Sequence, residues 1–205
     1  MESYTTILHK ASFEYEDRKS VFIATAMPVS TESEALSFLA SIKKEYPDAR
    51  HHVYAYVLRE NSIMRFSDDR EPQGTAGMPV LDIIRKNGCT DVAIVVIRYF
   101  GGTLLGTGGL VRAYSSSALG ALKAGNIITY DVYTELKFSV SYSDYQKVVP
   151  YLTDMEFRTE DTSYSDNVEI LGSVKKGKVE EILKGITEIT SGRSTNLIIG
   201  EKFSY

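Results

Sequence analysis

The sequence has little cysteine and no long apolar run, and each shortage excludes a class of protein. Cys89 is the only cysteine, so neither an intramolecular disulfide nor a cysteine-rich zinc site is possible. The apolar stretch Val92–Ile97 has six residues, and no run approaches the roughly 18 residues of a membrane helix. The start, Met1-Glu2-Ser3-Tyr4, has neither the basic nor the apolar region of a signal peptide. We therefore expect a soluble, cytoplasmic protein without a membrane partner.

Positive charge is not in excess either. The 205 residues include 23 Lys+Arg and 27 Asp+Glu, a formal net charge of −4. This balance argues against a general nucleic-acid-binding protein, which usually carries a basic face, but it leaves room for a local basic site. Residues 1–130 contain 14 basic and 14 acidic side chains, whereas residues 131–205 contain 9 and 13. The negative charge therefore lies in the second part of the chain.

The pattern of apolar residues predicts a mixed α/β class with two domains, residues 1–130 and 131–205. In the first domain, strands are expected at 21–29, 52–58, 63–66 and 92–100. A helix should follow the capping box formed by Thr31 and Glu34, and further helices are expected from 79 to 87 and from 109 to 123.

The second domain follows a different order. Strands are expected near 136–142, 156–163, 167–174 and 195–203, with helices between the first and second and between the third and fourth. Ser143 and Gln146 are expected to cap the first of these helices. The order β-α-β-β-α-β is that of a ferredoxin-like domain.

Glycine is absent before Gly74 and concentrated in the middle of the chain. Five of the 15 glycines lie between Gly101 and Gly109, after a predicted strand and before a predicted helix. Backbone N–H groups in such a loop, together with a helix N-terminus, attract anions. Arg98, at the end of the strand, and Arg112, expected in the first turn of the helix, are placed to bind the same anion. A tight turn with close packing of the helix on the strand is the alternative.

Known phosphate-binding loops do not match this segment. Thr107 stands where a Walker loop requires lysine, and Val111 stands where the dinucleotide fingerprint requires its third glycine. The loop is therefore not assigned to either class of nucleotide-binding protein.

The polar loop 67–77 holds three carboxylates in four positions, Asp68, Asp69 and Glu71. They could hold a divalent cation, bind a basic partner or pair with nearby arginines, although carboxylates in a surface loop are most often only solvated. The segment Gly74-Thr75-Ala76-Gly77 precedes a helix and is a second possible anion nest.

Metal and nucleophile motifs are missing. His51 and His52 are adjacent in a predicted strand and therefore face opposite sides, which argues against a metal site with two histidines. Neither the Gly-x-Ser-x-Gly elbow nor the His-Glu-x-x-His motif is present. We expect no metal, no cofactor and no assigned catalytic residue.

Together these segments resemble the signature of the Impact/YigZ family. The resemblance rests on Ser67–Gly77, on Val96-Ile97-Arg98-Tyr99-Phe100-Gly101-Gly102 and on the segment from Leu105 to Ser115. The family match covers about residues 18–125, and the remainder resembles the small C-terminal domain of the bacterial YigZ branch. One position departs from the family, which usually has glycine where this chain has Arg70.

The resemblance implies a fold and, less specifically, a function. The first domain should share the β-α-β topology of a small-subunit ribosomal protein and the GHMP kinases, and the second should resemble the last domain of elongation factor G. Eukaryotic members of the family regulate translation through protein partners during amino-acid starvation.

We therefore expect a regulator or binding module linked to translation or stress. Its partner would be a protein or a ribosome-associated factor, with RNA or a nucleotide possible at the first domain. The alternatives are an enzyme acting on a phosphorylated small molecule or nucleotide, and a purely structural role. The expected ligand-binding residues are His51, Asp68, Asp69, Glu71, Gly74, Thr75, Gly77, Arg98, Tyr99, Gly101, Gly102, Gly106, Gly108, Gly109 and Arg112.

Overall fold

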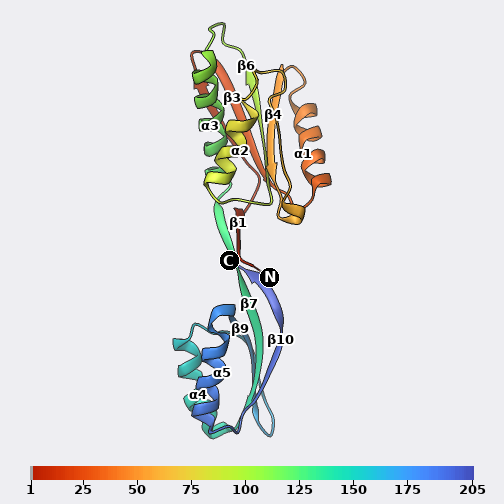
Figure 1. Cartoon of the computed structure of the whole chain (residues 1–205). Helices are drawn as coiled ribbons and strands as arrows, with labels where there is room; N and C mark the ends of the chain where they lie inside the picture. Colours follow the sequence, from red (N-terminus) through yellow and green to blue (C-terminus); the bar gives the residue numbers. More distant parts are fainter. Residues whose placement is uncertain (1) are drawn as a thin grey trace. The chain divides into compact units, whose positions relative to one another are not determined.

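The computed structural model describes residues 2–205, which form five α-helices and ten β-strands (Figure 1). The chain divides into an N-terminal unit, Tyr4–Thr129, and a C-terminal unit, Tyr130–Tyr205, to which residues 2 and 3 also belong. The mixed α/β class expected from the sequence is confirmed.

The N-terminal unit is built on one antiparallel sheet with the strand order β2-β3-β6-β4-β5. The central strand β6 is buried over seven of its eight residues. Such a continuous apolar strand requires cover on both faces of the sheet. The strands are β2 (Ala11–Asp17), β3 (Ser20–Pro28), β4 (His51–Val57), β5 (Met64–Ser67) and β6 (Val92–Tyr99).

Helices cover both faces of this sheet. Helices α2 (Gly77–Lys86) and α3 (Gly106–Ala124) lie on one face, and α1 (Glu32–Glu45) lies on the other (Figure 1). Because side chains alternate along a strand, Val96 of β6 packs in the core under α2 and α3, whereas its neighbour Val95 packs in the core beneath α1.

Two local predictions in the N-terminal unit are corrected. The sequence placed the first strand at 21–29, but β1 (Tyr4–Ile7) and β2 precede it. Strand β2 alternates apolar and polar residues and is largely exposed, so it lacks the continuous apolar run of a buried strand. Helix α3 begins at Gly106, three residues before the expected start.

The C-terminal unit has the predicted order β-α-β-β-α-β, with its four strands arranged as β8-β9-β7-β10. Both helices contribute to one core with Leu136 and Phe138. Ser141, rather than Ser143, caps the first helix by accepting the Asp144 N–H. The elements are β7 (Ile127–Val140), α4 (Tyr142–Asp154), β8 (Arg158–Tyr164), β9 (Val168–Lys175), α5 (Val179–Thr190) and β10 (Thr195–Ser204).

Candidate functional site

The sheet register brings the start of β4 and the end of β6 together at one end of the N-terminal unit. His51, the first residue of β4, pairs with Arg98 near the end of β6. Tyr99 pairs with Val21, next to the turn between β2 and β3. The glycine-rich loop 100–105, which follows β6, therefore begins where β4 begins and β2 turns into β3.

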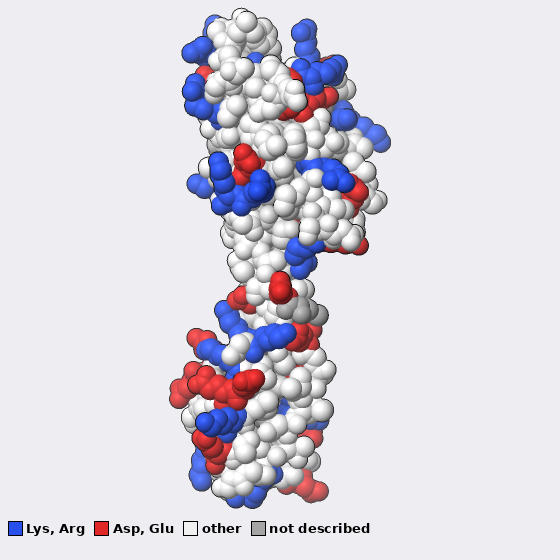
Figure 2. All heavy atoms as spheres, viewed as in Figure 1, with Lys and Arg blue, Asp and Glu red and all other residues white. Residues whose placement is uncertain are grey.

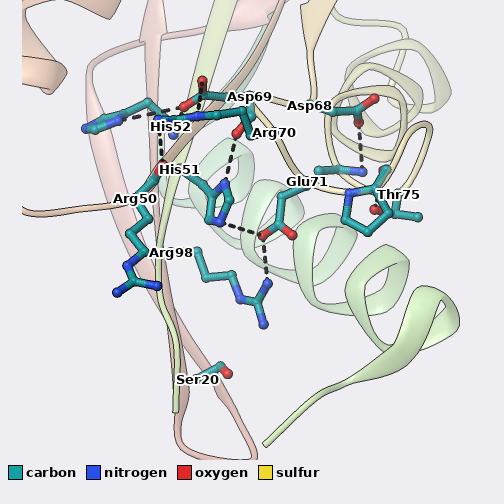
Figure 3. Close-up of polar contacts among 12 residues, drawn as sticks. Ser20, Arg50, His51, His52, Asp68, Asp69, Arg70, Glu71, Thr75 and Arg98 are labelled. Atoms are coloured by element: carbon teal, nitrogen blue, oxygen red, sulfur yellow. Dashed lines mark hydrogen bonds and ion pairs between the residues drawn. The ribbon is translucent and has the colours of Figure 1, made fainter. Parts of the chain in front are cut away.

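Glu71 lies buried at the centre of this end of the unit, with only 4% of its side chain exposed. Its Oε1 accepts hydrogen bonds from Arg98 Nη1 at 2.7 Å and from the Tyr114 hydroxyl at 2.8 Å. His51 Nε2 lies 4.0 Å from the same oxygen (Figure 3). Burial, and then the negative charge of Glu71, raise the pKa of Tyr114, so its hydroxyl keeps its proton and donates to Glu71.

Arg98 is a buried cation with an incomplete set of partners. Only 7% of the residue is exposed. Its Nη1 is used by Glu71, but its buried Nε has no hydrogen-bond partner among residues 2–205. The guanidinium lies 5.5 Å from the centre of the Phe22 ring and 5.6 Å from that of Phe100. Most buried polar groups in folded proteins are paired, so the unpartnered Nε requires an explanation.

A cavity of about 240 Å³ opens beside this arginine. Three of its lining residues carry basic side chains and two are apolar. We call it the basic cavity, and its lining residues are Arg50, His51, Arg98, Phe100 and Leu104.

The orientation of His51 follows from its hydrogen bond. Its Nδ1 lies 2.8 Å from the carbonyl oxygen of Asp69, and a carbonyl oxygen only accepts, so the proton is assigned to Nδ1. The Nε2 edge is left facing Glu71. His52, on the opposite side of the strand, is buried and bonds to the Tyr46 carbonyl instead.

The predicted anion nest at the start of α2 is present, and the chain fills it with its own carboxylate. Asp68 accepts hydrogen bonds from the backbone N–H groups of Gly74, Ala76 and Gly77 at 2.9, 3.1 and 2.8 Å. Ala76, the residue before α2, offers no side-chain cap, so Asp68 takes that role. The Thr75 hydroxyl is also satisfied locally, by the Pro72 carbonyl.

Asp69 holds β4 rather than facing the cavity. Its carboxylate accepts the His52 N–H at 2.7 Å, and it lies 3.8 Å from the Arg70 guanidinium. Arg70 adopts φ 71°, so the position that is usually glycine in the family has the left-handed conformation that favours glycine. Residues 2–205 contain no cluster of three histidine, cysteine or acidic side chains able to hold a metal ion.

The glycines of the 101–109 segment serve the turn and its packing. A Cβ at Gly101 would collide with the carbonyl group of Lys19, and its N–H donates to the Ser20 hydroxyl. Gly102 and Gly106 adopt φ values of +85° and +71°. A Cβ at Gly108 would meet no atom within 4 Å, whereas a Cβ at Gly109 would collide with the Leu105 side chain.

The expectation that Arg112 and Arg98 meet at one anion is wrong. Because α3 begins at Gly106, Arg112 lies in its second turn. It precedes Tyr114 by two residues, which is about 200° around the helix. Tyr114 is buried against Glu71, whereas Arg112 is exposed.

Sequence reasoning placed His51, Glu71 and Arg98 in the site but missed Arg50 and Tyr114. Tyr114 belonged to the apolar face of the predicted helix, and a buried tyrosine needs a partner for its hydroxyl. The sequence therefore indicated that the Tyr114 hydroxyl would need a polar partner in the core. Arg50 carries no local pattern, since only the pairing of β4 with β6 brings it to the cavity.

Comparisons with known proteins match both parts of the chain. Residues 18–122 match the Impact N-terminal domain, and residues 138–193 match a domain of unknown function, DUF1949. The IMPACT family member YvyE of Bacillus subtilis is 36% identical over 195 residues, covering 95% of this chain and 90% of the relative. The IMPACT family member YigZ of Escherichia coli is 31% identical over 204 residues, covering 98% and 100%.

A crystal structure of a hypothetical protein has the same fold, with a TM-score of 0.61 and 31% identity over 97% of this chain and 98% of that one. Fold and site define a mixed α/β protein with a buried glutamate–arginine–tyrosine cluster beside a basic cavity. The chain belongs to the Impact family. No helix within residues 2–205 is long and apolar enough to cross a membrane.

Proposed function

We propose that this protein is a regulatory binding module, linked to translation or stress, which recognises an anionic group of its partner in the basic cavity. The regulatory role rests on its resemblance to Impact proteins, whose eukaryotic members act on translation through protein partners. Recognition of an anion rests on one observation, the buried Arg98 whose Nε has no partner.

The charge around the cavity supports an anion. Two arginines line it, and Glu71 is the carboxylate that contacts Arg98. The net charge of this group is therefore positive even when His51 is neutral. A buried cation is costly unless it is paired and hydrogen-bonded. A ligand with two oxygen atoms could engage the free nitrogens of the guanidinium, the geometry in which arginine binds carboxylates and phosphates best.

Thermal and chemical unfolding with added phosphate tests anion binding. We expect sodium phosphate to stabilise the wild-type protein more than sodium chloride at equal ionic strength, by about 2.7 kcal/mol at 100 times its Kd. Arg50→Ala should weaken this effect. Arg112→Ala is the matched control, because it removes an exposed arginine of the same unit that does not line the cavity. Equal stabilisation of wild type by phosphate and chloride contradicts the proposal.

The regulatory role is tested separately in cell lysate. We expect the wild-type protein to co-sediment with ribosomes or to enrich a translation factor, and Arg50→Ala to lose that association while Arg112→Ala keeps it. Association that is the same in all three proteins would show that the basic cavity is not the recognition site.

An enzyme acting on a phosphorylated small molecule or nucleotide is the second candidate. It is favoured by the Nε2 edge of His51, which belongs to the wall of the same cavity and lies 4.0 Å from Glu71. Incubation with a panel of phosphorylated compounds, followed by assay of released phosphate and of product masses, tests it. Turnover that is lost in His51→Gln supports an enzyme, and unchanged compounds exclude one for that panel.

A further inference from the structure

We infer that the ligand of the basic cavity is the terminal phosphate of a nucleotide, either free or at the end of an RNA chain, with its base lying on the glycine-rich loop. This inference rests on the proposed function, because it names the ligand of the same site. It follows from three properties of the cavity, namely its donors, its size and its rim.

The donors at the cavity are suited to a group with more than two acceptor oxygens. Arg98 lines the cavity and has a buried Nε without a partner, and Arg50 is exposed beside it. His51 adds no donor with its proton on Nδ1, because that proton is used by the Asp69 carbonyl. A terminal phosphate offers three acceptor oxygens and close to two negative charges at neutral pH, whereas a carboxylate offers two oxygens and one charge. Two guanidinium groups, each with several N–H donors, therefore match the three oxygens and double charge of a phosphate better than a carboxylate.

The neighbouring acidic group does not cancel this positive charge. Asp69 accepts the His52 N–H and lies beside Arg70. Arg70 in turn donates to the carbonyl oxygen of Arg50 at 3.0 Å. The residue that replaces the family glycine thus adds a cation next to a residue that lines the cavity.

The size of the cavity admits an end group but not a whole ligand. Sites that enclose a complete small molecule usually measure about 300–1,000 Å³, and this cavity measures about 240 Å³. A ligand held there keeps most of its atoms outside. Those atoms must lie across the rim, so the chemistry of the rim indicates what they are.

The rim is apolar and exposed. Leu104 is 81% exposed and Phe100 is 52% exposed, and both line the cavity. Tyr99, the last residue of β6, is also exposed, but its side chain points to the face of the sheet opposite Arg98 and does not belong to this rim. Exposed aromatic side chains beside a cationic phosphate site are the platform on which bases stack. A planar base attached to the bound phosphate would cover Phe100 and Leu104.

Further cations are placed for a longer chain. Arg18 and Lys19 form the turn between β2 and β3, which Gly101 contacts closely. In Figure 2, blue side chains lie on both sides of a largely uncharged tip at the end of the N-terminal unit where α3 begins. An RNA end could therefore continue past the first nucleotide, whereas a free nucleotide would use the cavity and the platform alone.

Isothermal titration of the full-length protein tests this inference with defined probes: inorganic phosphate, uridine, UMP, and hexauridylate with either a 5′-phosphate or a 5′-hydroxyl. UMP should bind about ten-fold more tightly than inorganic phosphate, because base stacking on an aromatic side chain adds affinity. Uridine should bind at least ten-fold more weakly than UMP. Phe100→Ala should remove the advantage of UMP over phosphate, and Val111→Ala, an exposed apolar residue outside the cavity, should not.

The outcomes separate this inference from the proposed function. If phosphate binds but UMP binds no more tightly, the nucleotide inference is wrong and the anion site stands. If neither binds, both fail. Tighter binding of 5′-phosphorylated hexauridylate than of UMP supports an RNA end, whereas equal or weaker binding supports a free nucleotide. Equal binding of the two hexauridylates, both tighter than UMP, overturns recognition of a terminal phosphate. A Phe100→Ala protein that fails to fold is replaced by Phe100→Leu, which keeps an apolar side chain but removes the ring, and for which the same loss is expected.

Discussion

Arg98 and Glu71 are joined by one nitrogen and one oxygen, Nη1 to Oε1 at 2.7 Å. The same oxygen also accepts the Tyr114 hydroxyl. The buried ion pair therefore neutralises Arg98 without using its Nε. This relationship makes the cluster both a structural element of the N-terminal unit and one wall of the basic cavity.

Removing the acid should destabilise the N-terminal unit. Glu71→Ala leaves a buried arginine without its counter-charge, which costs about 3–5 kcal/mol. Tyr114→Phe removes one hydrogen bond to a charged group and should cost less, about 1.5–3 kcal/mol. Urea unfolding followed by circular dichroism measures both.

Phosphate provides a further readout of Glu71→Ala. The uncompensated Arg98 should bind the anion more tightly, so phosphate should stabilise Glu71→Ala more than wild type. A variant that unfolds like wild type, or one that phosphate leaves unaffected, would show that the pair does not hold Arg98 as described.

Arg70→Gly should stabilise the protein by about 0.5–1 kcal/mol. Arg70 has φ 71°, a conformation that costs an L-residue roughly 1–2 kcal/mol. Glycine avoids this cost, but part of the gain in stability is lost because glycine also has more conformational freedom in the unfolded chain. Arg70→Ala is the control. It also loses the hydrogen bond to the Arg50 carbonyl but keeps the unfavourable φ, so it should not stabilise. Equal midpoints of urea unfolding for the two variants would contradict this explanation.

Two glycines, Gly101 in the loop and Gly108 in the first turn of α3, should respond in opposite directions to alanine. Gly101→Ala places a Cβ against the Lys19 carbonyl group and should displace the β2–β3 turn, lowering the thermal midpoint by several degrees. Gly108→Ala meets no atom within 4 Å and lies inside α3, where alanine is favoured over glycine by up to about 1 kcal/mol. The Gly108 variant is expected to melt at or above the wild-type temperature, and a loss there as large as that at Gly101 would indicate that Gly108 has a packing role.

The sequence was informative wherever a local pattern decided the structure. The order of elements in the C-terminal unit and the buried strand β6 follow from apolar periodicity, and the resemblance to the Impact family is confirmed by both domain matches. Strand β2 was missed although Phe13 and Tyr15 alternate with acidic residues, which is the pattern of a half-buried strand.

The site was less accessible to sequence reasoning. Glycines and arginines that are close in sequence suggested an anion site between Arg98 and Arg112, but the phase of α3 turns Arg112 away from Tyr114. Arg50 joins Arg98 only through the pairing of β4 with β6. The nest at Gly74–Gly77 was recognised as a pattern, but the sequence did not reveal that Asp68 fills it.

Acid should weaken the C-terminal unit through Asp144. The Ser141 hydroxyl and then the Arg193 guanidinium lower the pKa of Asp144 below its ordinary value of 3.8. A depressed pKa gives stability that is fully present above the ordinary value and is lost as pH falls through the folded-state value. Asp144→Asn should therefore be less stable than wild type at neutral pH, and the difference should shrink as the pH falls below the ordinary pKa of an aspartate. A difference that does not change with pH would exclude the ionised carboxylate as its source.

The Nε–H of Arg98 is the atom pair on which the binding proposal depends, and ¹H–¹⁵N NMR observes it directly. Assignment by comparison with Arg98→Lys, followed by titration with UMP, measures whether this proton gains an acceptor. We expect a downfield shift of the Arg98 Hε signal that saturates together with binding, while the Arg112 Hε signal stays in place. Saturable UMP binding that leaves the Arg98 signal unchanged would show that the ligand lies elsewhere and that the unpartnered Nε is not a recognition group.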